Sequence, residues 1–490
     1  MALNTPQFFI FAVVVWIIYY SVNFRQRQRV LLMASLFFYA VLLNPSLMLA
    51  LLAIIYISYY GARRLQSHSA ATAKNRLLIL NITAILCILI LYKYIPFIFN
   101  SINSAGLFFL SRSLVPVPQT ILTIGLSYYS FQAISYLADV YLEKTQPTTD
   151  WEVHALYLSF FPKLLQGPIE RASHLVPQLS RSSKIDYDQF TRGGILILSG
   201  LFQKIVIADR LGLLVNRVYS NIEQSEPLII FIAVALYSFQ IYFDFSGYTD
   251  IALGTARCFQ IELSPNFNLP YGAISIPDFW RRWHITFSKF LTDYLFTPLQ
   301  MKYRNYRQGG TIIACLITFL VCGFWHGASW GFILWGLTHG LLFSASIISQ
   351  PLRKKTLQIS HLIQFPKLLK TIRIGWTFTI ISLSWILFRA NSVSDAFSIF
   401  KRLIRIPSRF ALSQSGMEIF NYGLNRYDFI IAIFSIVAIL FIQTLHQKKP
   451  VWDRLKMKPI WLRWSVYYMM IFSILLFGRF GESSFIYFQF

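Results

Sequence analysis

The fold is decided by residues 308–352, which read QGGTIIACLITFLVCGFWHGASWGFILWGLTHGLLFSASIISQPL. No Lys, Arg, Asp or Glu interrupts this stretch. A membrane-spanning helix needs roughly 20 apolar residues, so the stretch is long enough for two crossings. Its two histidines, His326 and His339, are each followed by glycine and lie among tryptophans. We therefore expect a helical hairpin that crosses the membrane twice and turns at His326-Gly327.

The predicted turn places His326 inside the membrane. As a helix, the half from Gly310 to Phe324 would be about 22 Å long at ~1.5 Å per residue, which is shorter than a hydrocarbon core of about 30 Å. Burial disfavours the charged form of histidine. A neutral imidazole can accept a proton from a hydroxyl group, which is the task of a general base. A packing or hydrogen-bonding role is the alternative, and the residues alone leave both open.

The composition extends this prediction to the whole chain, because 56% of the residues are hydrophobic and only 13% are charged. A soluble protein has about 25% charged residues. We predict one all-α, multi-pass membrane domain over residues 1–490, with about ten to twelve membrane segments, some of them short or re-entrant. Residues 1–24 lack a basic leader and are soon followed by another apolar run, so we expect no cleavable signal peptide. The other candidate segments lie within 30–62, 77–92, 114–138, 194–204, 227–243, 374–388, 429–447 and 464–478.

The net charge is +24, from 44 Lys+Arg against 20 Asp+Glu. In a soluble protein this excess would suggest nucleic acid, but here the basic residues cluster in short loops, which is typical of cytoplasmic loops. An external N-terminus would place four clusters in the cytoplasm: Arg25, Arg27 and Arg29; Arg63, Arg64, Lys74 and Arg76; Arg353, Lys354 and Lys355; and Lys448, Lys449, Arg454, Lys456 and Lys458. A fifth cluster, Lys401, Arg402 and Arg405, fits only if it belongs to an interfacial helix over 394–406 or if the number of crossings differs.

The four cysteines are scattered in or beside apolar runs, at positions 87, 258, 315 and 322. None shows CxxC spacing, so the sequence predicts neither a disulfide framework nor a metal site.

A first polar stretch, Phe160-Phe-Pro-Lys-Leu-Leu-Gln-Gly-Pro-Ile-Glu-Arg171, has two prolines and a glycine in an apolar setting. This pattern predicts a broken or re-entrant segment, which is tolerated at membrane depth only where it is buried in protein or lines a wet cavity. Glu170 and Arg171 would then be a charge pair at the mouth of such a cavity. The alternative is an ordinary interfacial loop with an ion pair on the surface.

A second polar stretch, Gln240-Ile-Tyr-Phe-Asp-Phe-Ser-Gly-Tyr-Thr-Asp250, directly follows an apolar run. An acid near the membrane interior is expensive and is by default a functional hypothesis. Asp244, Gly247 and Tyr248 could share one helix face. Hydrogen bonds that fix helix packing are the alternative role for Asp244 and Asp250.

A third polar stretch, Pro277-Asp-Phe-Trp-Arg-Arg-Trp-His-Ile-Thr-Phe-Ser-Lys-Phe-Leu-Thr-Asp-Tyr294, begins at a helix-start signal formed by Ser275 and Asp278. Such an aromatic and basic amphipathic helix usually lies in the membrane interface. An interfacial helix does not readily explain the presence of His284. The positive charges of Arg281 and Arg282 would suit the phosphates of a carrier or cofactor. The apolar stripe would consist of Trp280, Trp283, Phe287, Phe290 and Tyr294.

Four motifs in this order resemble the membrane-bound O-acyltransferase family: Gln166-Gly-Pro-Ile-Glu170, Asp244-Phe-Ser-Gly-Tyr-Thr-Asp250, Pro277-Asp-Phe-Trp-Arg-Arg-Trp-His284 and Gly323-Phe-Trp-His-Gly327. The resemblance is strongest to the bacterial branch with the alginate O-acetylase membrane subunit and the teichoic acid D-alanyl transfer protein. It implies a ring of tilted helices around a central tunnel, with His326 and His284 as the catalytic histidines. Weaker candidates for substrate or tunnel contacts are Asp244, Asp250, Tyr248, Gln166, Glu170, Arg281, Arg282, Trp325 and His339.

The resemblance implies transfer of an acetyl or other acyl group across a bacterial inner membrane. Acetyl-CoA or another thioester would be the donor substrate, with no bound cofactor and no metal. The acceptor would be a periplasmic partner protein that modifies an exported polysaccharide such as alginate, cellulose or peptidoglycan. The alternatives from other classes are a proton-coupled transporter or flippase, and a non-catalytic scaffold of a polysaccharide export complex.

Overall fold

The computed structural model describes residues 2–42, 45–119, 123–181, 184–359, 362–405, 419–448, 451–481 and 485–486. Within these ranges every regular element is a helix, as predicted. The chain divides into two compact units, residues 1–197 with 248–264, and residues 198–247 with 265–490. The prediction of one domain over the whole chain stays a prediction.

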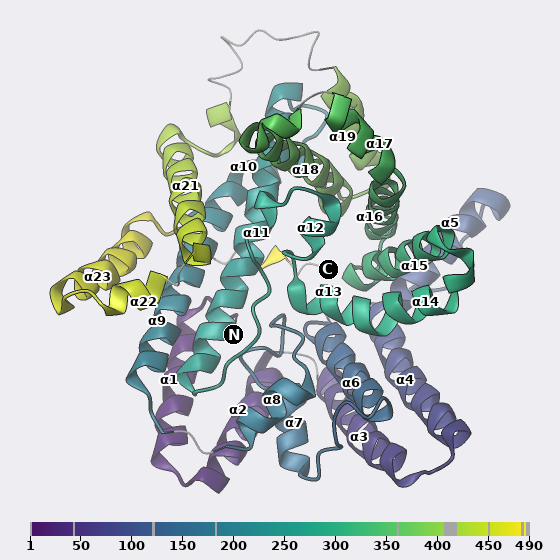
Figure 1. The fold of residues 1–490 in the computed structure, drawn as a ribbon, viewed down its shortest axis with the longest axis vertical. Coiled ribbons are helices and arrows are strands. Elements are labelled where there is room, and N and C mark those ends of the chain that lie inside the picture. The colour runs from purple at the N-terminus through teal and green to yellow at the C-terminus, as the bar shows by residue number, and fades with distance from the viewer. Residues whose placement is uncertain are drawn as a thin grey trace. The chain divides into compact units, whose positions relative to one another are not determined.

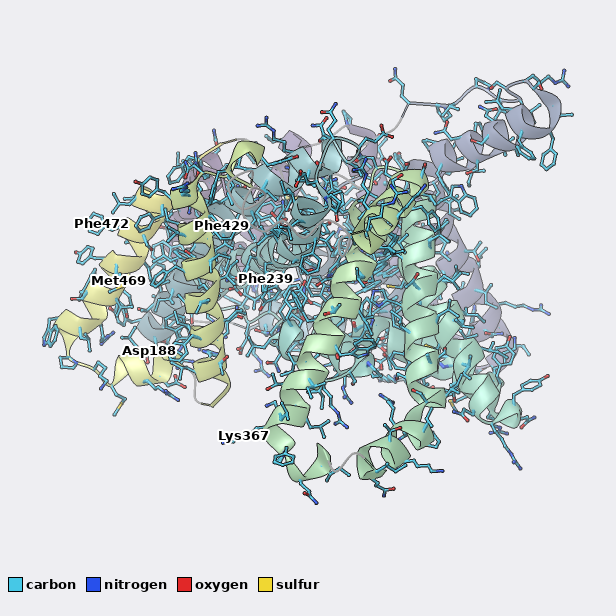
Figure 2. All side chains as sticks on the ribbon, turned by 90° about the horizontal axis from the view of Figure 1, so that it is seen from above. Asp188, Phe239, Lys367, Phe429, Met469 and Phe472 are labelled. Carbon is cyan, nitrogen blue, oxygen red and sulfur yellow. The ribbon has the colours of Figure 1, made fainter. Side chains whose placement is uncertain are left out.

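Eight of the described helices are long and apolar enough to cross a membrane, and two shorter apolar helices, α1 (Pro6–Ser21) and α5 (Ile95–Leu110), accompany them. Large apolar side chains on these helices face outward. On α23 (Ile460–Phe477), Met469 and Phe472 are 67% and 56% exposed and point away from the protein (Figure 2). An exposed apolar surface of this kind requires lipid, so the protein is a multi-pass membrane protein.

In the first unit, α3 (Pro45–Ser67), α4 (Ala71–Lys93) and α6 (Leu126–Tyr141) pack on one another (Figure 1). The run 30–62 forms two helices, since α2 ends at Leu42 and α3 begins at Pro45. The remaining helices that start in this unit are α2 (Phe24–Leu42), α7 (Trp151–Ser159), α8 (Ala172–Leu179) and α9 (Tyr187–Leu201).

The second unit holds α15 (Gln308–His326) and α16 (Trp330–Ile348), which form the predicted hairpin with its turn directly after His326. Its other α-helices are α10 (Asp209–Ser220), α12 (Ile276–Trp280), α13 (Ile285–Leu291), α14 (Thr297–Lys302), α17 (Gln350–Ile359), α18 (Pro366–Arg389), α19 (Val393–Ile404), α21 (Arg426–Lys448), α22 (Val451–Lys456) and α23. Two π-helical segments, η1 (Phe202–Ala208) and η3 (Thr292–Phe296), continue neighbouring helices. Short 3₁₀ turns lie at Pro270–Gly272, Arg304–Tyr306, Leu362–Gln364 and Ile419–Tyr422.

Glycines allow the two arms of the hairpin to touch. A Cβ at Gly336 would lie 2.3 Å from the carbonyl oxygen of Phe319 and 2.9 Å from the Cα of Gly323. A Cβ at Gly323 would lie 2.3 Å from the carbonyl oxygen of Phe332. These distances are shorter than any ordinary contact of a Cβ. The backbone contact between α15 and α16 therefore requires glycine on both helices.

The structure bears on three of the expected segments. The broken segment is confirmed, because residues 160–170 lie between α7 and α8 without a regular helix and are all buried. The second stretch is helical throughout, since α11 (Pro227–Cys258) runs through it without interruption, and this agrees with a shared helix face for Asp244, Gly247 and Tyr248. The interfacial helix over 394–406 corresponds to α19, whose N-cap Ser392 accepts a hydrogen bond from the backbone N–H of Asp395 at 3.0 Å. Residue 406 lies outside the described residues.

The expected amphipathic helix over 277–294 is wrong as a single element. Its start is confirmed, because the Ser275 side chain accepts a hydrogen bond from the backbone N–H of Asp278 at 3.2 Å. The helix then ends at Trp280, and a new helix begins at Ile285. The aromatic stripe is buried in protein from Trp280 to Phe290, so these rings contact other helices and not the membrane interface.

Candidate active site

His326 is the last residue of α15 and is only 5% exposed. Four aromatic rings surround its imidazole: Phe287 from α13 at 5.7 Å between ring centroids, Trp325 at 4.9 Å, Trp335 from α16 at 5.0 Å and Phe388 from α18 at 5.4 Å. Four helices thus build an aromatic enclosure around one histidine at the hairpin turn. Such an enclosure restricts the access of water to the ring.

His284 lies in the break between α12 and α13 and is fully buried. Its φ of 43° is left-handed, which is uncommon for a residue with a side chain. Its Nδ1 lies 3.3 Å from Oδ1 of Asn266, and the backbone N–H of Thr286 donates to the same oxygen at 3.3 Å. Because that oxygen only accepts, Nδ1 carries the proton and Nε2 is the acceptor atom of the ring. Burial lowers the pKa of His284 to about 3, so its imidazole is neutral near pH 7.

The structure brings His284 and His326 into one aromatic cluster. Phe287 contacts both, at centroid distances of 5.0 Å and 5.7 Å. Trp325 also lies near both, at 6.1 Å from His284 and 4.9 Å from His326. Phe287 and Trp325 stack on each other at 4.1 Å. The two predicted catalytic histidines therefore share two packing neighbours, although 41 positions separate them in the sequence.

His339 belongs to the same unit but has a different environment. Its Nδ1 accepts a hydrogen bond from the indole N–H of Trp280 at 3.3 Å, and its Nε2 lies 3.0 Å from Oγ of Ser384. An indole N–H is only a donor, so Nε2 carries the proton and donates to Ser384. The Ser384 hydroxyl in turn donates to the carbonyl oxygen of Ile381 at 2.7 Å. Both ring nitrogens of His339 are thus used to join α12, α16 and α18.

Trp335 is a neighbour of His326 that the sequence analysis missed. Its side chain is fully buried and stacks on Trp385 at 5.5 Å. Its indole N–H has no hydrogen-bond acceptor among the residues that the structure describes. A buried donor without an acceptor costs about 1–3 kcal/mol. Other buried side chains of the described residues share this property, so it is the position beside His326 that makes the Trp335 indole a candidate for binding. The spacing of aromatic residues in the sequence could not identify this tryptophan, because only the tertiary structure shows which indole N–H lacks an acceptor.

Arg281 and Arg282 both lie next to the carboxylate of Asp278. Arg282 donates from Nε to Oδ1 at 3.0 Å, and Arg281 is 3.6 Å from the same oxygen. The Arg281 side chain is 74% exposed, whereas that of Arg282 is 29% exposed. Arg281 is therefore the more accessible of the two for the phosphates of a ligand, and that role stays a prediction.

Asp244 takes part in a buried ion-pair network of the second unit. Lys204 lies 2.6 Å from its Oδ1 and 2.8 Å from Oδ1 of Asp209. The other carboxylate oxygen of Asp244 accepts the backbone N–H of Ile486 at 2.8 Å. Both oxygens are thus engaged in holding segments of the chain together, which favours the packing alternative for Asp244.

Glu170 of the first unit is 1% exposed. Its carboxylate accepts hydrogen bonds from His174 at 2.9 Å and from the hydroxyl of Ser264 at 3.1 Å. The hydrogen bond with Glu170 raises the pKa of His174. The alternative of a surface ion pair in an interfacial loop does not fit so buried a carboxylate. In the same unit, Gln166 and Tyr248 are also buried, whereas Asp250 is only partly buried.

The sequence profile of the membrane-bound O-acyltransferase family, MBOAT, matches residues 36–388, well over half of the chain. The chain belongs to this family and is an O-acyltransferase. The match covers the hairpin, both histidines of the aromatic cluster and the buried Glu170.

Among known proteins, the chain is similar to a peptidoglycan O-acetyltransferase of Helicobacter pylori, with 33% identity over 80% of this chain and 76% of the relative. It is also similar to a probable alginate O-acetylase of Azotobacter vinelandii, with 32% identity over 78% of this chain and 74% of the relative. A teichoic acid D-alanyltransferase of Bacillus subtilis is 28% identical over 47% of this chain and 60% of the relative.

Proposed function

We propose that this protein transfers acetyl groups from acetyl-CoA, at the cytoplasmic side of a bacterial inner membrane, towards an exported polysaccharide. The bacterial relatives named as O-acetyltransferases support the choice of acetyl as the transferred group and of a bacterial inner membrane as the location. One of them is named for peptidoglycan and another for alginate. The chemistry that they share is a sugar hydroxyl as the final acceptor. A periplasmic partner protein that receives the acetyl group before the polymer is part of the proposal.

The observation that carries the mechanism is the aromatic enclosure of His326. In the proposed step, His326 takes the proton from the acceptor hydroxyl while the hydroxyl oxygen attacks the thioester carbonyl carbon. The carbon–sulfur bond then breaks, and the protonated His326 gives the proton to the sulfur, which leaves as the thiol of CoA. The products are an acetyl ester and free CoA. Excluding water from this site protects the thioester from hydrolysis.

Two neighbours have supporting roles in this proposal. The neutral His284 in the same cluster offers an acceptor nitrogen, Nε2, because its Nδ1 donates to Asn266. The indole N–H of Trp335 is a buried donor beside His326. A donor in that position can stabilise the negative charge that develops on the thioester oxygen during attack. Donor and acceptor would reach His326 from opposite faces of the membrane, along a tunnel within a ring of helices.

The test uses the purified full-length protein in liposomes, with acetyl-CoA labelled in the acetyl group. We expect free CoA to appear only when an acceptor is present, and the His326→Ala variant to lose this release. His68→Ala is the matched control, because His68 is exposed and lies outside the cluster. Normal release by His326→Ala would contradict the proposed base. Proton-coupled uptake without acetyl transfer would instead favour a transporter.

The acceptor is tested in cells that lack the gene. Base-released acetate is measured separately in the exported polysaccharide and in peptidoglycan, with and without the gene restored. Loss of acetate from only one fraction identifies the polymer. Unchanged acetate in every exported glycan would contradict the proposed substrate class.

A further inference from the structure

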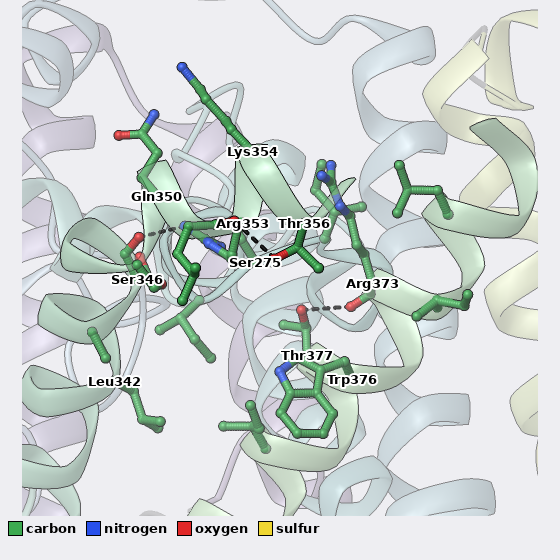
Figure 3. A pocket seen from close by; sticks show the side chains of 18 residues that line it. Ser275, Leu342, Ser346, Gln350, Arg353, Lys354, Thr356, Arg373, Trp376 and Thr377 are labelled. Atoms are coloured by element: carbon green, nitrogen blue, oxygen red, sulfur yellow. Dashed lines mark hydrogen bonds between the residues drawn. The ribbon is translucent and has the colours of Figure 1, made fainter. Parts of the chain in front are cut away.

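A cavity of about 780 Å³ lies between the end of α16, the helix α17 and the first half of α18 (Figure 3). It belongs to the second unit, and none of the residues proposed for catalysis lines it. The volume falls in the range of small-molecule sites, about 300–1,000 Å³. The cavity is thus large enough for a ligand much bigger than a single inorganic ion.

Cationic side chains line part of the cavity. Arg353, Lys354 and Arg373 line it, and a hydrogen bond from the Arg353 guanidinium to the backbone carbonyl of Ser346 holds that side chain at the wall (Figure 3). The sequence contains no Asp or Glu between Asp293 and Asp395. The cations of α17 and α18 therefore have no carboxylate close to them in the sequence. Asp278 follows the lining residues Ser275 and Ile276. Its carboxylate is already paired with Arg282 at 3.0 Å, so the charge of the cavity favours an anion.

Apart from hydroxyl side chains and Gln350, the rest of the lining is apolar. Leu342, Ile372, Trp376 and Ile380 contribute to it, and Trp376 is 68% exposed although it lies within the candidate span of α18. In a membrane, an exposed apolar wall of this kind contacts lipid chains. A ligand that fits both the cationic and the apolar side chains must combine an anionic group with an apolar body.

We propose that this cavity binds an anionic phospholipid, with its phosphate on Arg353, Lys354 and Arg373 and its acyl chains along the wall formed by Leu342 and Trp376. Basic pockets between transmembrane helices on the cytoplasmic side bind anionic headgroups. The positive-inside pattern predicts that the loop between α16 and α18 faces the cytoplasm. A soluble phosphate compound would satisfy the cations but would leave the apolar wall uncovered. This site goes beyond the proposed acyl transfer, and its test does not depend on that activity.

The test is native mass spectrometry of the purified full-length protein with added phosphatidylglycerol or phosphatidylcholine. We expect one phosphatidylglycerol to be retained and phosphatidylcholine to be bound more weakly. The double variant Arg353→Gln with Arg373→Gln should weaken phosphatidylglycerol binding about tenfold or more, because each cation near an anionic headgroup contributes about 1 kcal/mol.

The matched control is Lys367→Gln with Lys370→Gln. It removes the same charge from the same part of the chain, but neither lysine lines the cavity. Lys367 lies at the beginning of α18 (Figure 2). Equal weakening by both double variants would overturn the proposal, because it would show a general effect of surface charge. Unchanged binding in the cavity variant would overturn it as well.

A second variant keeps the arginines in place. Ala345 lines the cavity and is exposed, so Ala345→Trp should fill the space and displace the lipid without a change in charge. Retention of the lipid by this variant would contradict a site inside the cavity. Competition with inorganic phosphate and with CoA distinguishes the sources of the phosphate group, and displacement by either would assign the cavity to a soluble ligand in place of a phospholipid.

Discussion

The turn of the hairpin and the middle of α16 each hold a histidine followed by glycine, yet the two environments differ. His326 is enclosed by aromatic rings from four helices. His339 uses both ring nitrogens in hydrogen bonds to Trp280 and Ser384. A proton-transferring imidazole must exchange its hydrogen bonds during the reaction, whereas an imidazole that joins three helices must keep them. In the proposed mechanism, the same His-Gly pattern supplies a reactive group at one position and a structural link at another.

The largest effect that this comparison predicts is on activity. His326→Ala should lower the rate of acetyl transfer by about a hundredfold to ten-thousandfold, which is the usual contribution of a general base. His339→Ala should lower the rate much less, and mainly through a loss of folded protein. Rates of CoA release, normalised to folded protein by size-exclusion chromatography, measure both. Equal losses in the two variants would remove the distinction between the two histidines.

The next largest effect concerns the glycine contact between the two regions. Gly336→Ala should lower the free energy of unfolding by about 3 kcal/mol, because its Cβ would lie 2.3 Å from the carbonyl oxygen of Phe319. The matched control is Gly375→Ala in α18, where an added Cβ has no atom within 4 Å. That control should be neutral or slightly stabilising. Thermal unfolding in detergent measures both, and equal stability of the two variants would contradict the close packing.

A smaller effect is expected from removing only the hydrogen bonds of His339. A glutamine at position 339 cannot reach both partners in the same geometry. His339→Gln should therefore lower the free energy of unfolding by about 1–2 kcal/mol, because the Trp280 indole N–H or the Ser384 hydroxyl loses its hydrogen bond. Because His339 packs on Trp335 at 4.8 Å, the rate of acetyl transfer should also fall, by about tenfold or less. A thermal unfolding midpoint equal to that of the unsubstituted protein would show that these hydrogen bonds contribute little.

The smallest effect is a dependence of stability on pH. An unfolded chain protonates His284 near pH 6.5, whereas burial lowers the pKa of His284 to about 3 in the folded protein. Between these values only the unfolded chain carries the proton, so stability should fall as the pH drops below 6.5, by at most about 1.4 kcal/mol per unit. His284→Gln should reduce this slope, and the exposed His68→Gln should not. Unfolding midpoints between pH 7.5 and 5.5 measure the slopes.

Local sequence patterns correctly predicted features that involve only one helix end or one turn. The hairpin turn after His326, the N-cap at Ser275 and the broken segment between α7 and α8 were all predicted correctly, because glycine, proline and capping residues act over a few positions. The continuous helix over 277–294 was wrong. Its aromatic spacing is helical, but His284 adopts a left-handed conformation that only the surrounding packing maintains.

The sequence by itself determined the solvent, the helical class and the histidines to test. A chain with so few charged residues must cover much of its outside with lipid, and each backbone group in lipid must be paired within a helix. Only the tertiary structure decided which histidine is enclosed by rings and which is tied by hydrogen bonds. It also showed that Asp244 is paired with Lys204, and that Trp335 presents a donor beside His326. The physical reason is that these properties depend on neighbours from helices that are distant in the sequence, and the spacing of residues within one helix does not determine those contacts.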